Sequence, residues 1–159
     1  SQFNEYQLLD EVRGVTEFWR VPSNALEFEI TESMVMHNRD QAIVLMDAFK
    51  KEGFSLSIDD FGTGYSSLAY LKRFTVDSVK VDRSFIKDIP EDPNDTAIAH
   101  TIVAMAHTLG LKVIAEGVDS ATQLQTLQNF DCDEYQGYFF SKAIPARDFI
   151  ALLQQQVSN

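Results

Sequence analysis

The sequence has a single cysteine, Cys132, among its 159 residues, so no disulfide can form within the chain. A lone thiol suits a reducing compartment, and we expect a cytoplasmic protein or the cytoplasmic domain of a membrane-anchored parent. The sequence also lacks any run of the roughly 18–20 apolar residues that a membrane-spanning helix needs. Because 45% of the residues are hydrophobic, we expect one domain with its own core.

Positive charge is scarce as well: 13 Lys and Arg stand against 24 Asp and Glu, for a formal net charge of -11. Proteins that bind nucleic-acid polymers usually carry a basic stripe, and the sequence contains none. This composition argues against a general nucleic-acid binder, so an anionic ligand would need metal ions or a few well-placed cations. An overall excess of acidic residues is explained by solubility alone. Only the positions of individual acidic residues can therefore indicate a functional site.

Strand-like and helix-like segments alternate along the chain, which predicts an α/β fold with about five parallel strands. Alternating or short apolar patterns predict strands at residues 25–31, 54–58, 77–81, 111–115 and 134–140. Apolar spacings of three and four predict helices at residues 5–20, 39–52, 66–73, 94–109, 120–129 and 146–156. Asn94 or Asp95 is the expected N-cap of the fourth of these helices.

Polar residues, most of them acidic, recur where the predicted strands end. They are Glu29, Glu32, Asp59, Asp60, Lys80, Asp82, Glu116, Asp119 and Gln136. The ends of parallel strands face one rim, and in a (β/α) barrel that rim is where active sites are built. One or two such acids would be ordinary helix caps, but repetition after four successive strands favours a shared site.

Several ionised carboxylates on one rim repel one another, and bound divalent cations relieve that repulsion. All-oxygen ligands suit Mg²⁺, Mn²⁺ or Ca²⁺ rather than zinc. Two ions roughly 3.5–4 Å apart would clamp the attacking and leaving oxygens of a phosphoester. The glycine-rich turn that follows Asp59 and Asp60 would let both carboxylates reach such a site. A tight turn with an aspartate as helix cap explains "DDFGTG" equally well.

Lys80 is the one cation among these strand-end residues, and it lies two residues before Asp82, so both side chains share a face. It could orient an attacking water or neutralise a phosphate, whereas an isolated strand lysine is usually a surface residue. Gln136 could hydrogen-bond a base or phosphate, or cap a neighbouring backbone group, and the sequence leaves both open.

Five motifs, in order and spacing, give the chain a resemblance to the EAL domain family. They are "EITES" (29–33), "DDFGTGYSSL" (59–68), "VKVDRSFI" (79–86), "AEGVD" (115–119) and "YQGYFFSK" (135–142). The resemblance covers nearly the whole chain. It implies a (β/α)₈ TIM-like barrel that hydrolyses cyclic di-GMP to linear pGpG with two Mg²⁺ or Mn²⁺ ions, and with Ca²⁺ as an inhibitory ion.

Carried over position by position, the resemblance implies roles for the acids and the lysine. Asp59 would bridge the two ions, and Lys80 would orient the nucleophilic water with Asp82 supporting the site. The implied metal ligands are Glu29, Asp59, Asp60 and Glu116, and the implied catalytic residues are Lys80, Asp82 and Glu116.

Cyclic di-GMP would lie near Gln136 and Arg83. Glu32 would anchor a loop that couples dimerisation to activity, so the resemblance implies a homodimer, with an upstream sensor or GGDEF domain in a longer parent. The implied loop and dimer-coupling residues are Glu32, Phe61, Gly62, Thr63, Gly64 and Asp119. Asp119 and Ala143 replace the family's usual Glu and Pro, and neither change removes a proposed metal ligand.

Residues 1–159 resemble the last five-eighths of the barrel, without the first strands that carry the Glu-Ala-Leu motif and a metal-binding asparagine. Such an incomplete barrel of about five strands would expose two sheet edges, and we expect weak or no turnover from this chain alone. A catalytically silent cyclic di-GMP receptor and a structural or dimerisation module are the alternatives. The intact acids of "EITE" and "DDFG" favour an enzyme in the parent domain.

Overall fold

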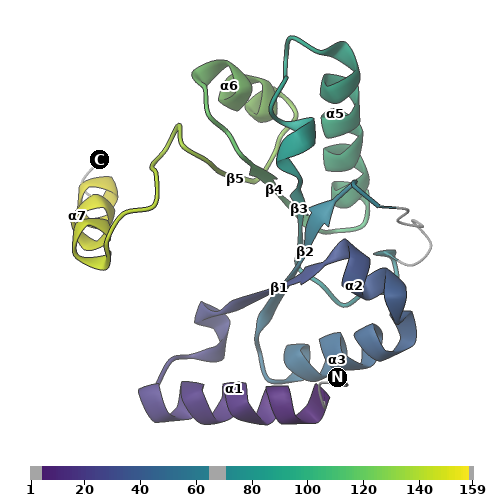
Figure 1. The fold of residues 1–159 in the computed structure, drawn as a ribbon, viewed down its shortest axis with the longest axis vertical. Coiled ribbons are helices and arrows are strands. Elements are labelled where there is room, and N and C mark those ends of the chain that lie inside the picture. Colours follow the sequence, from purple (N-terminus) through teal and green to yellow (C-terminus); the bar gives the residue numbers. More distant parts are fainter. Residues whose placement is uncertain (1–4, 65–70, 158–159) are drawn as a thin grey trace.

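Five parallel strands form a single sheet in the computed structural model, which describes residues 5–64 and 71–157. The strand order is β1-β2-β3-β4-β5, so each strand pairs with its neighbour in sequence. The strands are β1 (Glu27–Thr31), β2 (Ser55–Phe61), β3 (Ser78–Val81), β4 (Lys112–Glu116) and β5 (Glu134–Gln136). The α/β class and the five parallel strands are thereby confirmed, and the sheet is an open arc rather than a closed barrel (Figure 1).

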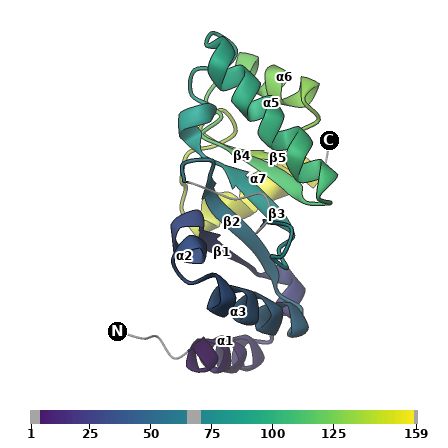
Figure 2. The ribbon, with the colours of Figure 1, turned by 90° about the vertical axis from the view of Figure 1, so that its right-hand side faces the viewer.

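The helices lie mainly on one side of this arc. They are α1 (Glu5–Trp19), α2 (Glu32–His37), α3 (Arg39–Lys51), α5 (Pro93–Thr108), α6 (Ala121–Asn129) and α7 (Ala146–Val157), with short 3₁₀ turns η1 (Ser23–Ala25) and η2 (Arg83–Phe85). In Figure 2, α3 and α5 lie in front of the sheet and α7 lies behind it, and Figure 1 shows α7 set apart from the other elements. Within the described ranges, no helix is both long and apolar enough to cross a membrane.

The core lies between the sheet and helices α3 and α5. Strand residues alternate between the two faces, so Leu56 and Ile58 of β2 point toward the helices, where both are buried. Phe49 of α3 packs edge-on against Phe28 of β1, with ring centroids 4.9 Å apart. The opposite face of the sheet is left to the polar residues of the strands, and that face carries the candidate site.

The expected start of α5 and the expected end of β5 were wrong. Helix α5 begins earlier than predicted, because Asp92 is the N-cap: its carboxylate accepts from the backbone N–H groups of Asn94 and Asp95, and Pro93 occupies the first turn. Strand β5 ends at Gln136 rather than at residue 140, because the backbone turns at Gly137 and Phe139 N–H donates to Val118 O. The helix predicted at residues 66–73 falls mostly outside the described residues.

Candidate active site

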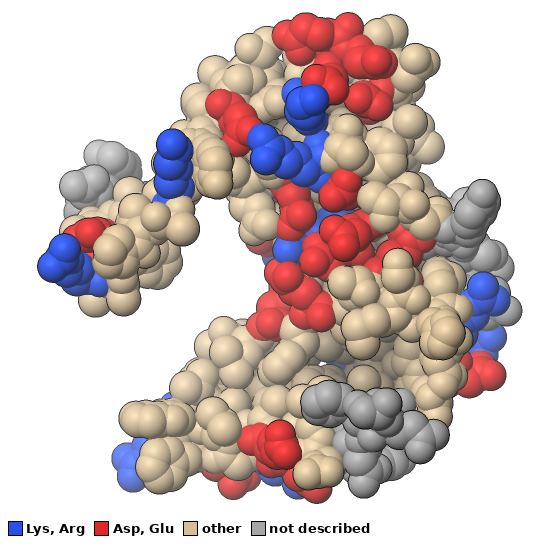
Figure 3. Space-filling view, viewed as in Figure 1, with Lys and Arg blue, Asp and Glu red and all other residues tan. Residues whose placement is uncertain are grey.

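The ammonium group of Lys80 lies among three carboxylates from three other strands. Lys80 Nζ is 2.7 Å from Glu29 Oε1 on β1, 2.6 Å from Glu116 Oε1 on β4, and 3.5 Å from Asp59 Oδ1 on β2. The lysine is 5% exposed, so it is an interior residue and not the surface lysine of the alternative interpretation. Figure 3 shows acidic side chains gathered at the centre of the hollowed side of the molecule.

Strand register brings these four side chains to the same face. Lys80 of β3 pairs with Ile114 of β4, and Glu116 lies two residues after Ile114. Asp59 of β2 pairs with Thr31 of β1, and Glu29 lies two residues before Thr31. Side chains two residues apart on a strand point to the same face. Burial disfavours the charged form of Lys80. Hydrogen bonds from Lys80 to the carboxylates of Glu116 and Glu29 outweigh that effect and raise its pKa above the usual range. The group therefore stays a cation at neutral pH.

The two adjacent aspartates occupy different positions. Asp59 is partly buried, and its Oδ1 has no hydrogen-bond partner among the described residues. Asp60 is exposed and has φ of 55°, in the left-handed region that few non-glycine residues adopt. The pairing of β2 with β3 is irregular between Ile58 and Phe61, which places this kink at the strand end. The structure thus brings Glu29, Asp59 and Glu116 together on Lys80, while Asp60 lies beside them at the surface.

Asp60 is coupled to the cluster through charge. Desolvation and the neighbouring carboxylates of Asp59 and Asp82 raise its pKa above the ordinary value of 3.8. Asp82 itself accepts from the backbone N–H and the hydroxyl of Ser84, and so caps η2 at the border of the site.

Gln136 bonds to the cluster, and Arg83 packs against Gly117, the residue that follows Glu116. Gln136 Nε2 donates to Glu116 Oε1 at 2.7 Å, a partner that neither sequence interpretation named. Arg83 Nη2 is 2.8 Å from Asp119 Oδ2, and Asp119 Oδ1 accepts from the backbone N–H of Tyr138. Arg83 lies directly over Gly117, where an added Cβ would be 2.3 Å from Arg83 Cγ. Sequence reasoning did not find this support, and the glycine in "AEGVD" was its only signal.

Glu32 holds the glycine-rich segment after β2. It is 1% exposed, and its Oε2 accepts from Gly62 N–H at 2.9 Å and from Gly64 N–H at 3.4 Å. Gly62 has φ of 101°, which favours glycine, and Thr63 Oγ1 donates to Asp60 O. Phe61 is buried beneath the segment. The predicted anchoring contact of Glu32 with this loop is present, and the loop beyond Gly64 lies outside the described residues.

The donor set suits hard divalent cations, because it consists of carboxylate oxygens with no sulfur or imidazole. Asp59 Oδ1 is a carboxylate oxygen of this kind, buried without a hydrogen-bond partner among the described residues and 3.5 Å from Lys80 Nζ. As the side chains stand, no three Asp, Glu, His or Cys residues of the described ranges are arranged around a common metal position. Lys80 bonds two of the candidate ligands instead. The side chains are therefore of the chemical kind that binds these ions, and the Lys80 ammonium lies between Glu29 and Glu116.

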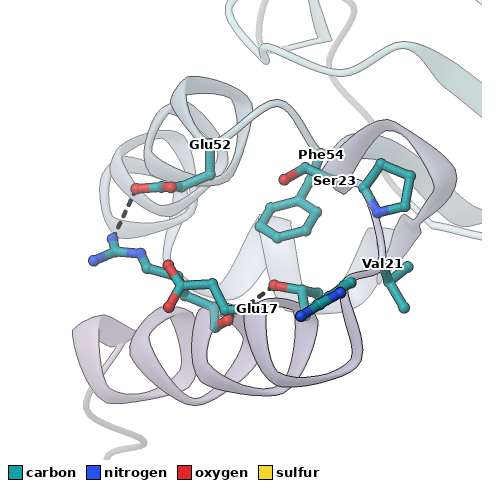
Figure 4. Close-up of a pocket in the computed structure, with 9 residues that line it drawn as sticks. Glu17, Val21, Ser23, Glu52 and Phe54 are labelled. Atoms are coloured by element: carbon teal, nitrogen blue, oxygen red, sulfur yellow. Dashed lines mark hydrogen bonds and ion pairs between the residues drawn. The ribbon is translucent and has the colours of Figure 1, made fainter.

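Two other features lie away from this cluster. A hollow of about 310 Å³ opens between α1, the turn at Val21, and Glu52 and Phe54. The Arg13–Glu52 ion pair forms one end of its lining (Figure 4). Cys132 is no candidate nucleophile, because burial, together with the charge of Asp133, raises the pKa of its thiol to about 11.

Comparison with known proteins identifies the family. The model of the EAL domain matches residues 1–143. The chain belongs to the EAL domain family. Over 145 residues it is 50% identical to the cyclic di-GMP phosphodiesterase NbdA of Pseudomonas aeruginosa, covering 91% of this chain and 18% of that protein. It is 42% identical to the signaling protein YkoW of Bacillus subtilis, covering 99% of this chain and 20% of that protein. The chain thus spans about a fifth of the length of these relatives.

Solved EAL structures match the fold over part of their length. A PaMucR phosphodiesterase in complex with c-di-GMP matches with a TM-score of 0.88 and 39% identity, covering 93% of this chain and 60% of that chain. The EAL domain of Mycobacterium smegmatis DcpA matches at 0.89 with 33% identity, covering 97% and 69%. Klebsiella pneumoniae BlrP1, a manganese and cy-diGMP complex, matches at 0.78 with 33% identity, covering 87% and 36%. The chain is therefore a partial EAL domain, as the resemblance implied.

Proposed function

We propose that this chain supplies the strand-end face of a metal-dependent phosphodiesterase that hydrolyses cyclic di-GMP to linear pGpG and so lowers this second messenger in bacterial signalling. The supporting observation is the convergence of Glu29, Asp59 and Glu116 on the buried Lys80 at one rim of the sheet. Relatives named as cyclic di-GMP phosphodiesterases, and relatives with c-di-GMP in their structures, support the substrate.

The proposed metal ligands are Glu29, Asp59, Asp60 and Glu116. When bound, Mg²⁺ or Mn²⁺ would supply charge neutralisation at the phosphate and a bound water of lowered pKa. The metal complexes of BlrP1, with manganese in one structure and calcium in another, support this choice of cations.

The protein's own groups would bind the substrate and position the water. Lys80 would donate to the attacking water and hold it in line with the scissile P–O bond. Gln136 fixes the Glu116 carboxylate through its 2.7 Å hydrogen bond. Arg83, held by Asp119, would donate a charge-assisted hydrogen bond to a phosphate oxygen of cyclic di-GMP. The loop held by Glu32 would couple a homodimer to the site, and a sensor or GGDEF domain would regulate it in a longer parent.

The test is hydrolysis of cyclic di-GMP with Mn²⁺, followed by chromatography of pGpG. In an intact EAL domain that contains these residues, Asp59→Asn should lower turnover by roughly a hundredfold or more, because it removes a charged ligand from the reacting centre. Asp88→Asn is the matched control, since Asp88 is exposed and pairs only loosely with Lys87 at 3.8 Å.

Unchanged metal-dependent hydrolysis in Asp59→Asn would refute the role of Asp59. Binding of cyclic di-GMP by the intact unaltered domain without any pGpG would favour the catalytically silent receptor instead. For the 159-residue chain by itself we propose weak or no turnover, and robust turnover would show that the missing-ligand argument is wrong.

A further inference from the structure

We propose that Lys80 is a built-in counter-ion that competes with divalent cations for the same carboxylates, so that metal binding displaces its ammonium from Glu29 and Glu116. The inference builds on the proposed function, because it concerns the proposed metal ligands. It is tested by metal binding and by the state of Lys80, so its outcome is independent of hydrolysis.

The first step is the charge balance around Lys80. Three carboxylates lie around the Lys80 ammonium at the strand ends, and ionised carboxylates that are close together repel one another. Lys80 provides the opposing charge: it bonds Glu29 and Glu116 and lies 3.5 Å from Asp59. Its near-complete burial means that these carboxylates, rather than water, solvate the ammonium. The four strands are therefore joined at this end by a single cation.

The second step is competition for individual oxygen atoms. Glu116 Oε1 accepts from Lys80 Nζ at 2.6 Å and from Gln136 Nε2 at 2.7 Å. A carboxylate oxygen has two lone pairs, so this atom can take a metal ion only when one donor leaves. Asp59 Oδ1 accepts no hydrogen bond from the described residues, although it is buried and lies 3.5 Å from Lys80 Nζ. A divalent cation held by Asp59, Glu116 and Glu29 would therefore have to replace Lys80 at these oxygens.

The third step is what displacement does to Lys80. In the structure, Lys80 directs two of its three N–H donors to Glu29 and Glu116, and these two are not available to a water or a phosphate. Once the carboxylates turn to a divalent cation, the ammonium must find new acceptors. The acceptors that enter with the substrate are the phosphate oxygens and the attacking water. Metal binding would therefore free the Lys80 ammonium to bind the phosphate oxygens and the attacking water.

The test is calorimetric titration of MnCl₂ into the 159-residue chain and its variants. Lys80→Met should bind Mn²⁺ about tenfold more tightly or better, since it removes a positive charge that occupies the ligands. Lys112→Met is the matched control and should bind like the unaltered chain, because Lys112 is an exposed lysine of the same sheet that pairs with Glu134 at 3.2 Å. Equal or weaker binding by Lys80→Met overturns the inference, as does the absence of Mn²⁺ binding in every variant.

A measurement on the unaltered chain covers the case in which Lys80→Met does not fold. With ¹⁵N-labelled lysine, the Nζ signal of Lys80 should shift as Mg²⁺ is added, because its hydrogen-bond acceptors change. The signal of Lys112 should stay in place. Saturation with Mg²⁺ that leaves the Lys80 signal unmoved would overturn the inference without bearing on hydrolysis. If Mg²⁺ displaces Lys80 in an intact domain that releases no pGpG, the proposed function is refuted and the inference is supported.

Discussion

Two serine hydroxyls lie buried one layer below the acid cluster. Ser57 precedes Asp59 by two residues and Ser78 precedes Lys80 by two, so both serines share the face of the site. The two residues are register partners on β2 and β3. Each is almost fully buried, and neither hydroxyl has a hydrogen-bond partner among the described residues. A buried hydroxyl without a partner costs free energy, because it has lost its hydrogen bonds to water.

Ser57→Ala and Ser78→Ala should each leave the free energy of unfolding unchanged or raise it by roughly 1 kcal/mol, because each removes an unsatisfied buried hydroxyl. Urea denaturation followed by circular dichroism measures the change. The control is Ser84→Ala, which removes a hydroxyl that is bonded to Asp82 and should lower the stability slightly. A loss above about 1 kcal/mol in either buried variant would mean that an ordered water or ion binds the serine pair.

At the residue scale, the sequence predicted which strand-end side chains converge better than it predicted their individual contacts. The positions of Glu29, Asp59 and Glu116 at predicted strand ends placed them on one rim. This followed from the strand pattern alone, because side chains alternate between the two faces of a strand and parallel strands end at the same edge. Asp60 is separated from Asp59 by a backbone kink, with φ of 55° at Asp60. Two adjacent aspartates in a sequence do not indicate which of them adopts such a conformation. The Gln136–Glu116 hydrogen bond likewise depends on side-chain geometry across two strands.

At the element scale, the end of β5 is set by its contact with the segment after β4. Val118 N–H donates to Gln136 O, and Phe139 N–H donates to Val118 O. Gly137 lies so close to this segment that an added Cβ would be 2.1 Å from Val118 O. A backbone oxygen cannot move aside as a flexible side chain can, so the position requires glycine.

Gly137→Ala should lower the free energy of unfolding by roughly 2–3 kcal/mol, the cost of overpacking against a fixed backbone. It should also separate β5 from β4 and so weaken the hold of Gln136 on Glu116. Thermal or chemical unfolding measures the first effect. Gly14→Ala is the matched control: Gly14 lies in α1 with nothing within 4 Å of an added Cβ, and alanine there should stabilise the helix by up to roughly 1 kcal/mol. Equal stability of the two variants would contradict the proposed clash.

Some elements were predicted from the sequence and others were not, for identifiable reasons. The long amphipathic helices α1 and α3 follow from apolar spacing. The short helix α2 was missed because six residues carry too little periodicity, although Thr31 caps it through Met34 N–H. The early start of α5 was missed because several polar residues in a row could serve as caps, and the hydrogen bonds alone select Asp92.

At the scale of the whole molecule, a contact between a histidine and an aspartate joins the helical layer to the far end of the sheet. His107 of α5 contacts Asp133 before β5, with 2.8 Å between Nε2 and Oδ2, and the same carboxylate accepts from Val113 N–H of β4. Desolvation by burial acts against ionisation of Asp133, but the hydrogen bonds from His107 and Val113 outweigh it and lower its pKa below 3.8.

Stability of the whole chain should therefore depend on pH through Asp133. A carboxylate whose pKa is lowered by folding stabilises the fold at pH values above its unfolded pKa of 3.8, and this contribution disappears as the pH falls through its lower folded pKa. The difference in unfolding free energy between the unaltered chain and Asp133→Asn should be full at about pH 5 and should shrink toward pH 3. Urea denaturation across this range measures it, with Asp131→Asn as the neighbouring control. A difference that stays constant down to pH 3 would contradict the assignment.

The arrangement of the whole sheet was predictable because alternating strands and helices leave few topologies. The separate position of α7 was not predictable. Phe149, Ile150 and Leu153 give α7 the amphipathic pattern of a packed helix, yet all three are exposed in the structure. Amphipathic spacing predicts that a helix forms and which face is apolar, and it says nothing of what covers that face.

The strand order has a consequence for how the protein is made. Each strand pairs with the one synthesised just before it, from β1 through β5, so no early strand has to wait for a distant partner to leave the ribosome. Lys80 emerges after Glu29 and Asp59 and before Glu116. The two earlier acids therefore meet their cation as β3 joins the growing sheet, and β4 closes the set without a long interval of unbalanced charge.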